Sequence, residues 1–425
     1  MRAFIDRGAG PTALSFIVVT GLLLACTAQA EPLSLTEAQR LAVERDAGGE
    51  ALRSESDAMR QMAVAAGQLP DPEGRIGAVN VPVDSWKFDR EDMTMLEVGL
   101  MQRFPAGRSR QYARARYESD ALGADAEALG RARSVRLEVE RAWRELDYLE
   151  LSLGLVAEES RWLTALAGGA DAAYAAGVGE SLGLLDARLM ALELEERRLD
   201  LERERDGMLA ELARWVGDAV RRERRAAPAP VRALDPVEAL LERLQANPML
   251  ESLSHAREAA LRQADLASEM YKPSFGLDVA YGFRSGPGMD GLSRPDMLTA
   301  MVTFDVPLFT RNRQDQEVGA ARARARAADA RRADALRELE AGLRAAHARA
   351  LRLGEIVSLY ERQAARLAGV SLDAALASYR AGEGSLADVV TLHHRMLDLH
   401  GREARARTDH ALALAEIEYL AGELP

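Results

Sequence analysis

The sequence predicts a mainly helical protein with membrane β-strands, built from a duplicated unit of helix, two strands, long helix, turn and helix. Three observations predict this fold class. A turn sequence occurs twice, two alternating runs precede a long helical segment in each half, and the apolar residues of these segments repeat every 3.5 positions. We expect the coiled-coil-like helices to form an α-barrel and the four strands of each chain to contribute to a shared β-barrel.

The duplication is clearest at the turn sequence. Residues 174–179 read YAAGVG, and about 205 residues later residues 379–384 read YRAGEG. Pro105 and Pro307 recur at nearly the same offset. Because such repeats define the unit of architecture, we divide the chain into four parts. These are a signal peptide at residues 1–30, a first repeat at 31–220, a linker at 221–235 and a second repeat at 236–425.

The N-terminus has the composition of a secretory signal. Basic residues precede an apolar stretch at residues 14–26, and Ala28 and Ala30 form a small-residue cleavage site before Glu31. We therefore expect the mature chain to leave the cytoplasm. Cys26, the only cysteine, follows residues that loosely fit a lipoprotein cleavage site, so its lipidation is the alternative. A single cysteine forms no disulfide within the chain.

Composition and charge exclude several functions. The formal net charge is −12, both signs are mixed along the same segments, and no basic stripe of the kind that nucleic acid requires is present. Beyond the signal no run of about 18 apolar residues occurs, so a membrane crossing would have to use strands. The sequence has no nucleophile beside a base, no phosphate-binding loop and no metal-spaced Cys/His cluster. We expect neither enzymatic activity nor a cofactor or metal site.

The first repeat opens with a helix at residues 35–68, for which Ser34 is the expected N-cap. Alternating runs at residues 75–85 and 96–101 then predict two strands, the first of them extending past Val83. A helix at residues 107–168 follows, which would be roughly 90 Å long if it is continuous. That length exceeds the diameter of a globular core and favours a tube.

The second repeat shows the same order more plainly. Runs at residues 275–284 and 298–306 each alternate over a length that crosses a membrane when the strand is tilted. Phe275, Leu277, Tyr281 and Phe283 form an apolar stripe that we expect to face lipid. The opposite face is polar, and we expect it to line a water-filled lumen. Its candidate residues are Glu97, Asp278, Arg284, Thr299, Thr303 and Asp305.

In the long helix predicted for the second repeat, apolar residues stay on one face for many turns. From Leu336 through Val357 to Leu367 its apolar residues step alternately by three and four positions. This repeat is typical of helices that pack side by side in a left-handed coil. Residues 132–156 show the same pattern in the first repeat.

The strand number predicts an oligomer. Four strands leave open edges whose backbone groups lack partners in lipid, and the smallest stable barrels have about eight strands. Two copies would give eight strands around an interior filled by side chains, whereas three would give twelve strands and a lumen. A conduit therefore predicts a homotrimer.

The chain resembles the TolC-like outer membrane efflux proteins. The resemblance covers essentially the whole mature chain, and the duplicated turn followed by a long helix is its most specific motif. Residues 69–105, which contain LPDP, NVP and MQRFP, are more similar to the members of heavy-metal efflux systems. The resemblance implies a passive duct in the Gram-negative outer membrane that extends into the periplasm. It also implies a homotrimer with a 12-stranded barrel, a periplasmic adaptor, an inner membrane RND-type pump and surrounding outer membrane lipid as partners.

The resemblance further implies a closed periplasmic entrance at the helix turns, where an aspartate ring narrows the pore and a tyrosine helps to hold it shut. The candidate residues in this chain are Tyr174, Asp186, Tyr379, Asp388 and Thr391. Thr391 stands where a second aspartate is common, and Asp186 supplies that carboxylate from the first repeat. Such a ring would favour cations. Alternatively, Asp186 and Asp388 are solvated charges near helix N-termini.

The glycines at the two turns have two interpretations. Gly177, Gly179, Gly382 and Gly384 permit a tight reversal between long helices, and their lack of side chains would also let an adaptor helix approach closely. Gly384 stands where drug-efflux members often carry an arginine, which puts an arginine-locked gate in doubt.

Three histidines, His393, His394 and His400, lie close together near the second turn. They lack the convergent ligands of a metal site, and we expect a surface or helix-packing role.

Two rival functions remain open. A periplasmic adaptor or coiled-coil scaffold would also be secreted and helical, although an adaptor usually has one helical hairpin with small β domains and this chain duplicates its hairpin and strand pair. An outer membrane duct for drugs or for secreted proteins is the other alternative to heavy-metal cations.

Overall fold

The structure is a computed structural model that describes residues 32–175, 181–225, 234–288 and 290–422. The predicted signal sequence with Cys26 lies outside these residues, and so do Gly177 and Gly179. Tyr174 and Asp186 belong to described helices, but their side chains are outside the described part.

Each half of the chain runs through helices, two strands and long helices. The first half contains α1 (Leu35–Arg45), α2 (Ala47–Ala66), β1 (Glu73–Val79), β2 (Met95–Phe104), α3 (Ser109–Ala175), α4 (Ser181–Val216) and the short helix η1 (Gly217–Arg221). The second half contains α5 (Val237–Arg243), η2 (Leu244–Ala246), α6 (Pro248–Glu269), β3 (Phe275–Phe283), β4 (Met297–Phe304), α7 (Gln314–Leu359), the π-helical turn η3 (Tyr360–Ala364), α8 (Ala365–Arg380) and α9 (Leu386–Leu420). The predicted fold class, long helices combined with a small antiparallel sheet, is confirmed.

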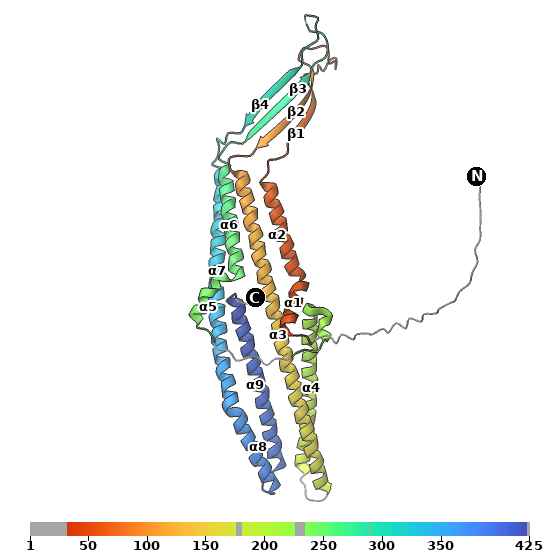
Figure 1. Ribbon diagram of the computed structural model, residues 1–425, viewed down its shortest axis with the longest axis vertical. Helices are drawn as coiled ribbons and strands as arrows, with labels where there is room; N and C mark the ends of the chain where they lie inside the picture. Colours follow the sequence, from red (N-terminus) through yellow and green to blue (C-terminus); the bar gives the residue numbers. More distant parts are fainter. Residues whose placement is uncertain (1–31, 176–180, 226–233, 289, 423–425) are drawn as a thin grey trace, which may run out of the picture.

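The described chain is elongated, with the sheet at one end and the long helices extending away from it (Figure 1). The end of α3, the start of α4 and the α8–α9 turn all lie at the end opposite the sheet. Short helices and the chain connections gather at about half height. The helix ends that flank the first predicted turn therefore lie at the same end of the molecule as the second turn.

Capping residues set the helix starts. The Ser34 hydroxyl accepts a hydrogen bond from the Glu37 backbone N–H at 3.2 Å, as the sequence predicted for α1. Asp46 separates α1 from α2: its carboxylate accepts from Gly49 N–H at 2.8 Å and forms an ion pair with Arg131 of α3 at 3.0 Å. One side chain therefore both starts α2 and ties it to the central helix.

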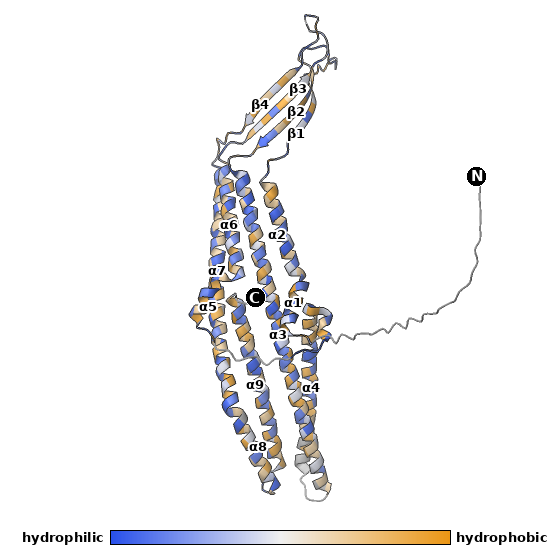
Figure 2. Cartoon of the chain, in the orientation of Figure 1, coloured by the Kyte–Doolittle hydropathy of each residue, from blue (hydrophilic) through white to orange (hydrophobic). Residues whose placement is uncertain are grey.

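The four strands form a single antiparallel sheet in the order β1-β2-β3-β4. The central β2–β3 pair joins the two halves of the chain, and Val98 lies opposite Tyr281. Figure 2 shows apolar and polar residues interleaved along these strands. One hairpin from each repeat is thus fused into one surface.

Strand β1 is shorter than its alternation predicts. It ends at Val79, and Asn80 adopts φ 55°, which breaks the extended conformation. The Asn80 carbonyl accepts a hydrogen bond from the Thr94 hydroxyl at 2.7 Å and closes the strand end. Val83 lies in the connection to β2 and is exposed. The prediction of a strand through residue 85 is wrong because alternating valines do not reveal the backbone reversal at Asn80.

Helix α3 is continuous for 67 residues, which corresponds to about 100 Å. The apolar stripe predicted for this helix is confirmed as its buried face, since Val135, Val139 and Leu146 are fully buried against α1 and α4. In the second half, Leu343 and Ala346 are buried against α5 and α9 in the same manner. Among the described residues, no helix combines the length with the apolar character that spanning a membrane requires.

The buried apolar stripe predicted along the long helix of the second half is interrupted at the π-helical turn η3, between α7 and α8. Val357 is buried before the turn, whereas Leu367 after it is exposed and Leu372 becomes buried instead. A π turn inserts extra backbone into the helical repeat and rotates the following residues about the axis. The prediction that Leu367 continues the buried stripe is therefore wrong. Its spacing in the sequence fits a regular α-helix, but the π-helical turn η3 rotates it away from the buried face.

The connection between the halves is fixed where Arg224 meets α3. The backbone pairs with the N-terminal segment, since Leu33 N–H donates to Glu223 O at 2.8 Å and Arg225 N–H donates to Leu33 O at 3.0 Å. The nearly buried Arg224 side chain forms ion pairs with Asp147 at 3.1 Å and Glu150 at 2.8 Å. Residues 226–233 of the predicted linker are outside the described residues.

Asp147 makes the stability of this connection depend on pH. Burial raises the pKa of the Asp147 carboxyl from 3.8 to about 6, although the Arg224 guanidinium lowers it. Between these values the folded chain holds a proton that the unfolded chain has lost, so the contribution of Asp147 to stability falls as pH rises from about 4 to about 6. Asp147→Asn keeps an acceptor for Arg224 and removes the titration. We expect the melting temperature of this variant, relative to the wild type, to increase over that pH range.

The control for this prediction is Glu150→Gln, which alters the other carboxylate partner of Arg224. If the melting-temperature difference between Asp147→Asn and the wild type stays constant with pH, or if Glu150→Gln reproduces its rise, the assignment to the Asp147 carboxyl fails.

Candidate functional site

The α8–α9 turn is held by a compact set of backbone hydrogen bonds. Gly382 has φ +78°, its N–H donates to Tyr379 O at 3.0 Å, and Glu383 N–H donates to Ser378 O at 3.0 Å. This is the Schellman arrangement, in which a glycine at positive φ ends a helix. A Cβ at Gly384 would lie 2.9 Å from Ser378 Oγ. The geometry thus supports the turn-forming interpretation of both glycines.

Asp388 lies in the first turn of α9. The Ser385 hydroxyl caps the helix by accepting from Asp388 N–H at 3.1 Å, and it donates to Asp388 Oδ2 at 2.7 Å, so the Asp388 carboxylate holds the capping hydroxyl in place. The Asp388 side chain remains exposed at the tip. Within one chain Asp388 therefore stabilises a helix N-terminus, while its free surface stays accessible to other copies of the chain.

The other candidate gate residues differ in their surroundings. The Thr391 hydroxyl donates to Ala387 O at 2.8 Å, back along its own helix. Tyr379 is 36 % exposed, and within the described part of the chain its hydroxyl has no hydrogen-bond partner. The structure thus brings Tyr379, Asp388 and Thr391 to one turn. The side chains of Tyr174 and Asp186 in the first turn are not among those described.

The polar face of the sheet contains most of the predicted lumen residues. Glu97, Asp278, Thr299 and Thr303 lie on this face, and the apolar stripe of β3 lies on the other. Arg75 of β1 connects two of them: its guanidinium is 2.7 Å from Asp278 Oδ1 and 3.0 Å from Glu97 Oε1.

The role of Arg75 in this three-residue cluster was missed by sequence reasoning. Its partner Asp278 is more than 200 positions away, and by alternation Arg75 shares a face with Val79 and Val81, so the local pattern gave no signal for this cluster.

Arg284 and Asp305 lie just beyond the strand ends. The Arg284 backbone N–H donates to Asp296 Oδ1 at 3.0 Å. The Asp305 carboxylate accepts from the Ser274 hydroxyl at 2.7 Å and its N–H at 2.5 Å, and so fixes the junction between α6 and β3 to the end of β4. Their geometry favours roles in the connections at the two rims of the sheet.

Arg294 is a second residue that sequence reasoning missed. Its guanidinium is almost buried and donates to the backbone carbonyls of Ser285, Asp89 and Glu91 at 2.8, 3.2 and 3.2 Å. It also forms an ion pair with Asp92 at 3.0 Å. The long connections of the two hairpins are thereby joined at the end of the sheet that is distant from the helices.

The histidines near the turn take part in helix packing. His393 of α9 stacks on Trp162 of α3 with ring centroids 3.8 Å apart, and burial lowers its pKa. The neighbouring His394 places Nδ1 2.7 Å from Glu159 Oε1. No group of three or more His, Cys, Asp or Glu residues arranged to hold a metal ion occurs among the described residues.

Comparison with known proteins agrees with this geometry. A family model described as outer membrane efflux protein matches residues 240–423, whereas no curated protein matches. The outer membrane protein VceC from Vibrio cholerae is 18% identical over 91% of this chain and 96% of that chain, with a TM-score of 0.75. CusC is 13% identical over 91% of both chains, with a TM-score of 0.77. The Neisseria gonorrhoeae outer membrane channel MtrE is 17% identical over 91% and 88%, with a TM-score of 0.73.

The fold and the match over the second half define the class of protein. Residues 240–423 match the outer membrane efflux protein family and the fold is similar to the solved structures named above, so the predicted family resemblance is confirmed. The family also bears out the predicted outer membrane location and the prediction of a protein that is not an enzyme.

Proposed function

We propose that three copies of this chain form a passive export duct across the outer membrane and the periplasm. The observation that carries the proposal is an open four-stranded sheet with one polar and one apolar face, joined directly to a helix about 100 Å long. The apolar face would contact lipid and the polar face a water-filled lumen. The helices would continue the lumen towards the α3–α4 and α8–α9 turns.

The edges of the sheet support the trimer. In a single chain the outer edges of β1 and β4 have no strand partner in the described sheet. Unpaired backbone groups are costly in lipid, so each edge needs a strand from another copy. Three copies would give about twelve strands, enough to enclose water.

We further propose that the duct works in a tripartite system, with a periplasmic adaptor docked near the helix turns and an inner membrane RND-type pump. The tip, where Gly382 is exposed and Gly384 is half-buried, offers closely approachable backbone for such an adaptor. Heavy-metal cations are the proposed cargo. The motif-bearing residues 69–105 and the acidic groups Glu97, Asp278 and Asp388 support a cation path, although Arg75 offsets part of the charge on the sheet.

Planar bilayer recordings test this function. We expect the wild-type protein to give ion conductance with a reversal potential that shows cation preference. Asp388→Ala, alone and combined with Asp186→Ala, is expected to raise conductance and to shift the reversal potential towards zero, because a ring of carboxylates that attracts cations at the constriction is removed.

Asp373→Ala is the matched control, because it removes an exposed carboxylate on α8 away from the turn. A protein that leaves the bilayer silent would instead be a scaffold. Conductance with an unchanged reversal potential in both Asp388 variants would show that these carboxylates only stabilise helix N-termini.

A further inference from the structure

An apolar projection lies where β4 passes into α7. In the connection at residues 305–313, Leu308 is 73 % exposed and Phe309 is 91 % exposed. Phe309 is more exposed than any other large apolar side chain of the described chain. Leaving such a side chain in water forgoes the favourable free energy that its burial would release. Adjacent exposed apolar side chains of this kind mark a surface that something covers.

The corresponding junction of the first half is built differently. Ala106 and Gly107 occupy the positions, counted from the preceding proline, that Leu308 and Phe309 occupy in the second half. Gly107 has φ +48°, and a Cβ there would collide with Oε2 of Glu269. The first junction is thus filled from within the chain, whereas the apolar residues of the second are not used for internal packing.

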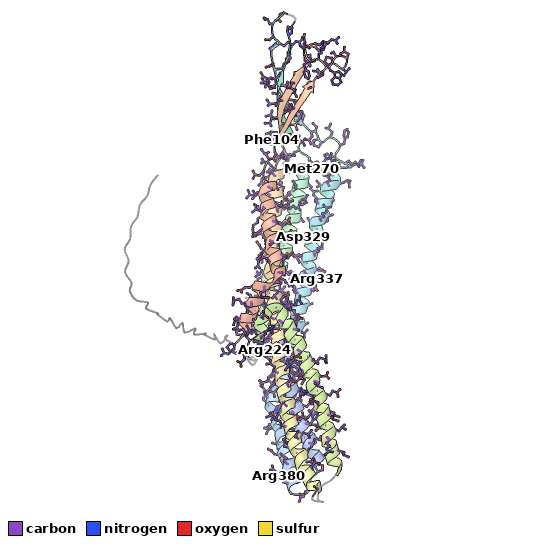
Figure 3. The ribbon with its side chains drawn as sticks, turned by 90° about the vertical axis from the view of Figure 1, so that its right-hand side faces the viewer. Phe104, Arg224, Met270, Asp329, Arg337 and Arg380 are labelled. Carbon is purple, nitrogen blue, oxygen red and sulfur yellow. The ribbon has the colours of Figure 1, made fainter. Side chains whose placement is uncertain are left out.

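The projection continues the apolar face of the sheet. Val302 and Phe304 lie on that face of β4, and the exposed Val306 follows with the same alternation. Figure 3 labels Phe104 and Met270, which mark the level where strands give way to long helices. Leu308 and Phe309 therefore lie at the helical edge of the surface assigned to lipid.

Two arginines follow the apolar pair. Arg311 and Arg313 are both exposed, and the Arg311 guanidinium has no ion-pair or hydrogen-bond partner in the part of the chain that the structure describes. Arg313 lies close enough to Asp305 to interact with it electrostatically. An aromatic side chain beside basic residues at the end of a membrane strand is typical of the boundary between hydrocarbon and headgroups.

We propose that Leu308 and Phe309 insert into the inner leaflet of the outer membrane and that Arg311 and Arg313 bind the phosphate groups of its phospholipids. The proposal rests on the proposed function, since it requires β4 to lie in the membrane. The rival occupant of the projection is a neighbouring copy of the chain. The two basic side chains and the continuity with the apolar sheet face favour phospholipid.

Fluorescence quenching by brominated lipids tests this proposal. Phe309→Trp is made in a Trp86→Phe background, which leaves only Trp143, Trp162 and Trp215 in the helices. The full-length protein is reconstituted in phosphatidylcholine vesicles whose acyl chains carry bromine near the headgroup or near the methyl end. We expect the tryptophan at position 309 to lose most fluorescence with bromine near the headgroup.

Leu277→Trp is the matched control, because Leu277 lies within β3 on the apolar face. The tryptophan at position 277 is expected to lose most fluorescence with bromine near the methyl end. Quenching at position 277 without quenching at position 309 overturns the insertion and leaves the duct intact. Absence of quenching at both positions overturns the proposed function as well.

The arginines have a separate readout. In vesicles that contain anionic phosphatidylglycerol brominated near the headgroup, we expect stronger quenching at position 309 than with phosphatidylcholine, because cationic side chains concentrate anionic lipid. Arg311→Gln combined with Arg313→Gln is expected to abolish this difference. If the difference persists in the double variant, the arginines do not bind the headgroups.

Discussion

Replacing Trp143 with alanine is expected to lower the free energy of unfolding by about 3–5 kcal/mol, the range found for removing a buried aromatic side chain. Trp143 is 1% exposed and lies in the cluster that joins α1, α3 and α4. Its ring also lies beneath the Arg224 guanidinium, with the Arg224 Cζ 4.9 Å from the ring centroid. The substitution would therefore empty a core site and also remove the surface that fixes the connection between the halves.

Trp86→Ala is the matched control, since Trp86 is 72 % exposed in the β1–β2 connection. We expect this change to alter stability by less than about 0.5 kcal/mol. The measurement is thermal unfolding of the detergent-solubilised protein, followed by far-ultraviolet circular dichroism at 222 nm as a helix signal. Equal melting temperatures for the two variants would contradict the assignment of Trp143 to the core between α1, α3 and α4.

The fold was predictable because its signals are local and repeated. Alternation identified the sheet faces of β3 and β4, and a period of 3.5 residues identified the buried face of α3. Each signal occurs in both halves, so each half serves as a check on the other. The errors fall where one residue changes the backbone without changing the pattern, as at Asn80 and at the π-helical turn η3.

The candidate site was only partly predictable for a related reason. Asp388 and Tyr379 were found through a motif within one turn, and the structure places them on that turn. Arg75 and Arg294 act across more than 200 positions, on Asp278 and on the β1–β2 connection. Contacts of this separation depend on how the two hairpins pair, which no local pattern encodes. A gate or a lumen would further require several copies of the chain. The proposed gate and lumen residues are therefore tested by the conductance experiments rather than by the contacts within one chain.

Cleavage after Ala30, rather than lipidation of Cys26, is the result that we expect at the mature N-terminus. Leu33 is paired with residues 223 and 225, and Arg224 between them donates to Trp143 O of α3 at 3.3 Å. Because α3 is continuous from Ser109, the rise from Trp143 to the strand end of the helix is about 50 Å. The backbone between Cys26 and Leu33 can extend at most about 25 Å. A lipid on Cys26 could therefore reach a membrane around the strands only if Leu33 left its partners.

Mass spectrometry of the protein isolated from outer membranes measures this directly. We expect a mature chain that begins with an unmodified Glu31, and we expect Cys26→Ala to leave its mass and membrane location unchanged. Ala28→Leu is the matched variant, because a large residue at this site blocks signal cleavage, and it is expected to accumulate the uncleaved form. A mature chain that begins with a diacylglyceryl-modified Cys26 would contradict the prediction. It would also imply that the pairing of Leu33 with the linker opens in the membrane, since a tether of that length cannot otherwise span the distance.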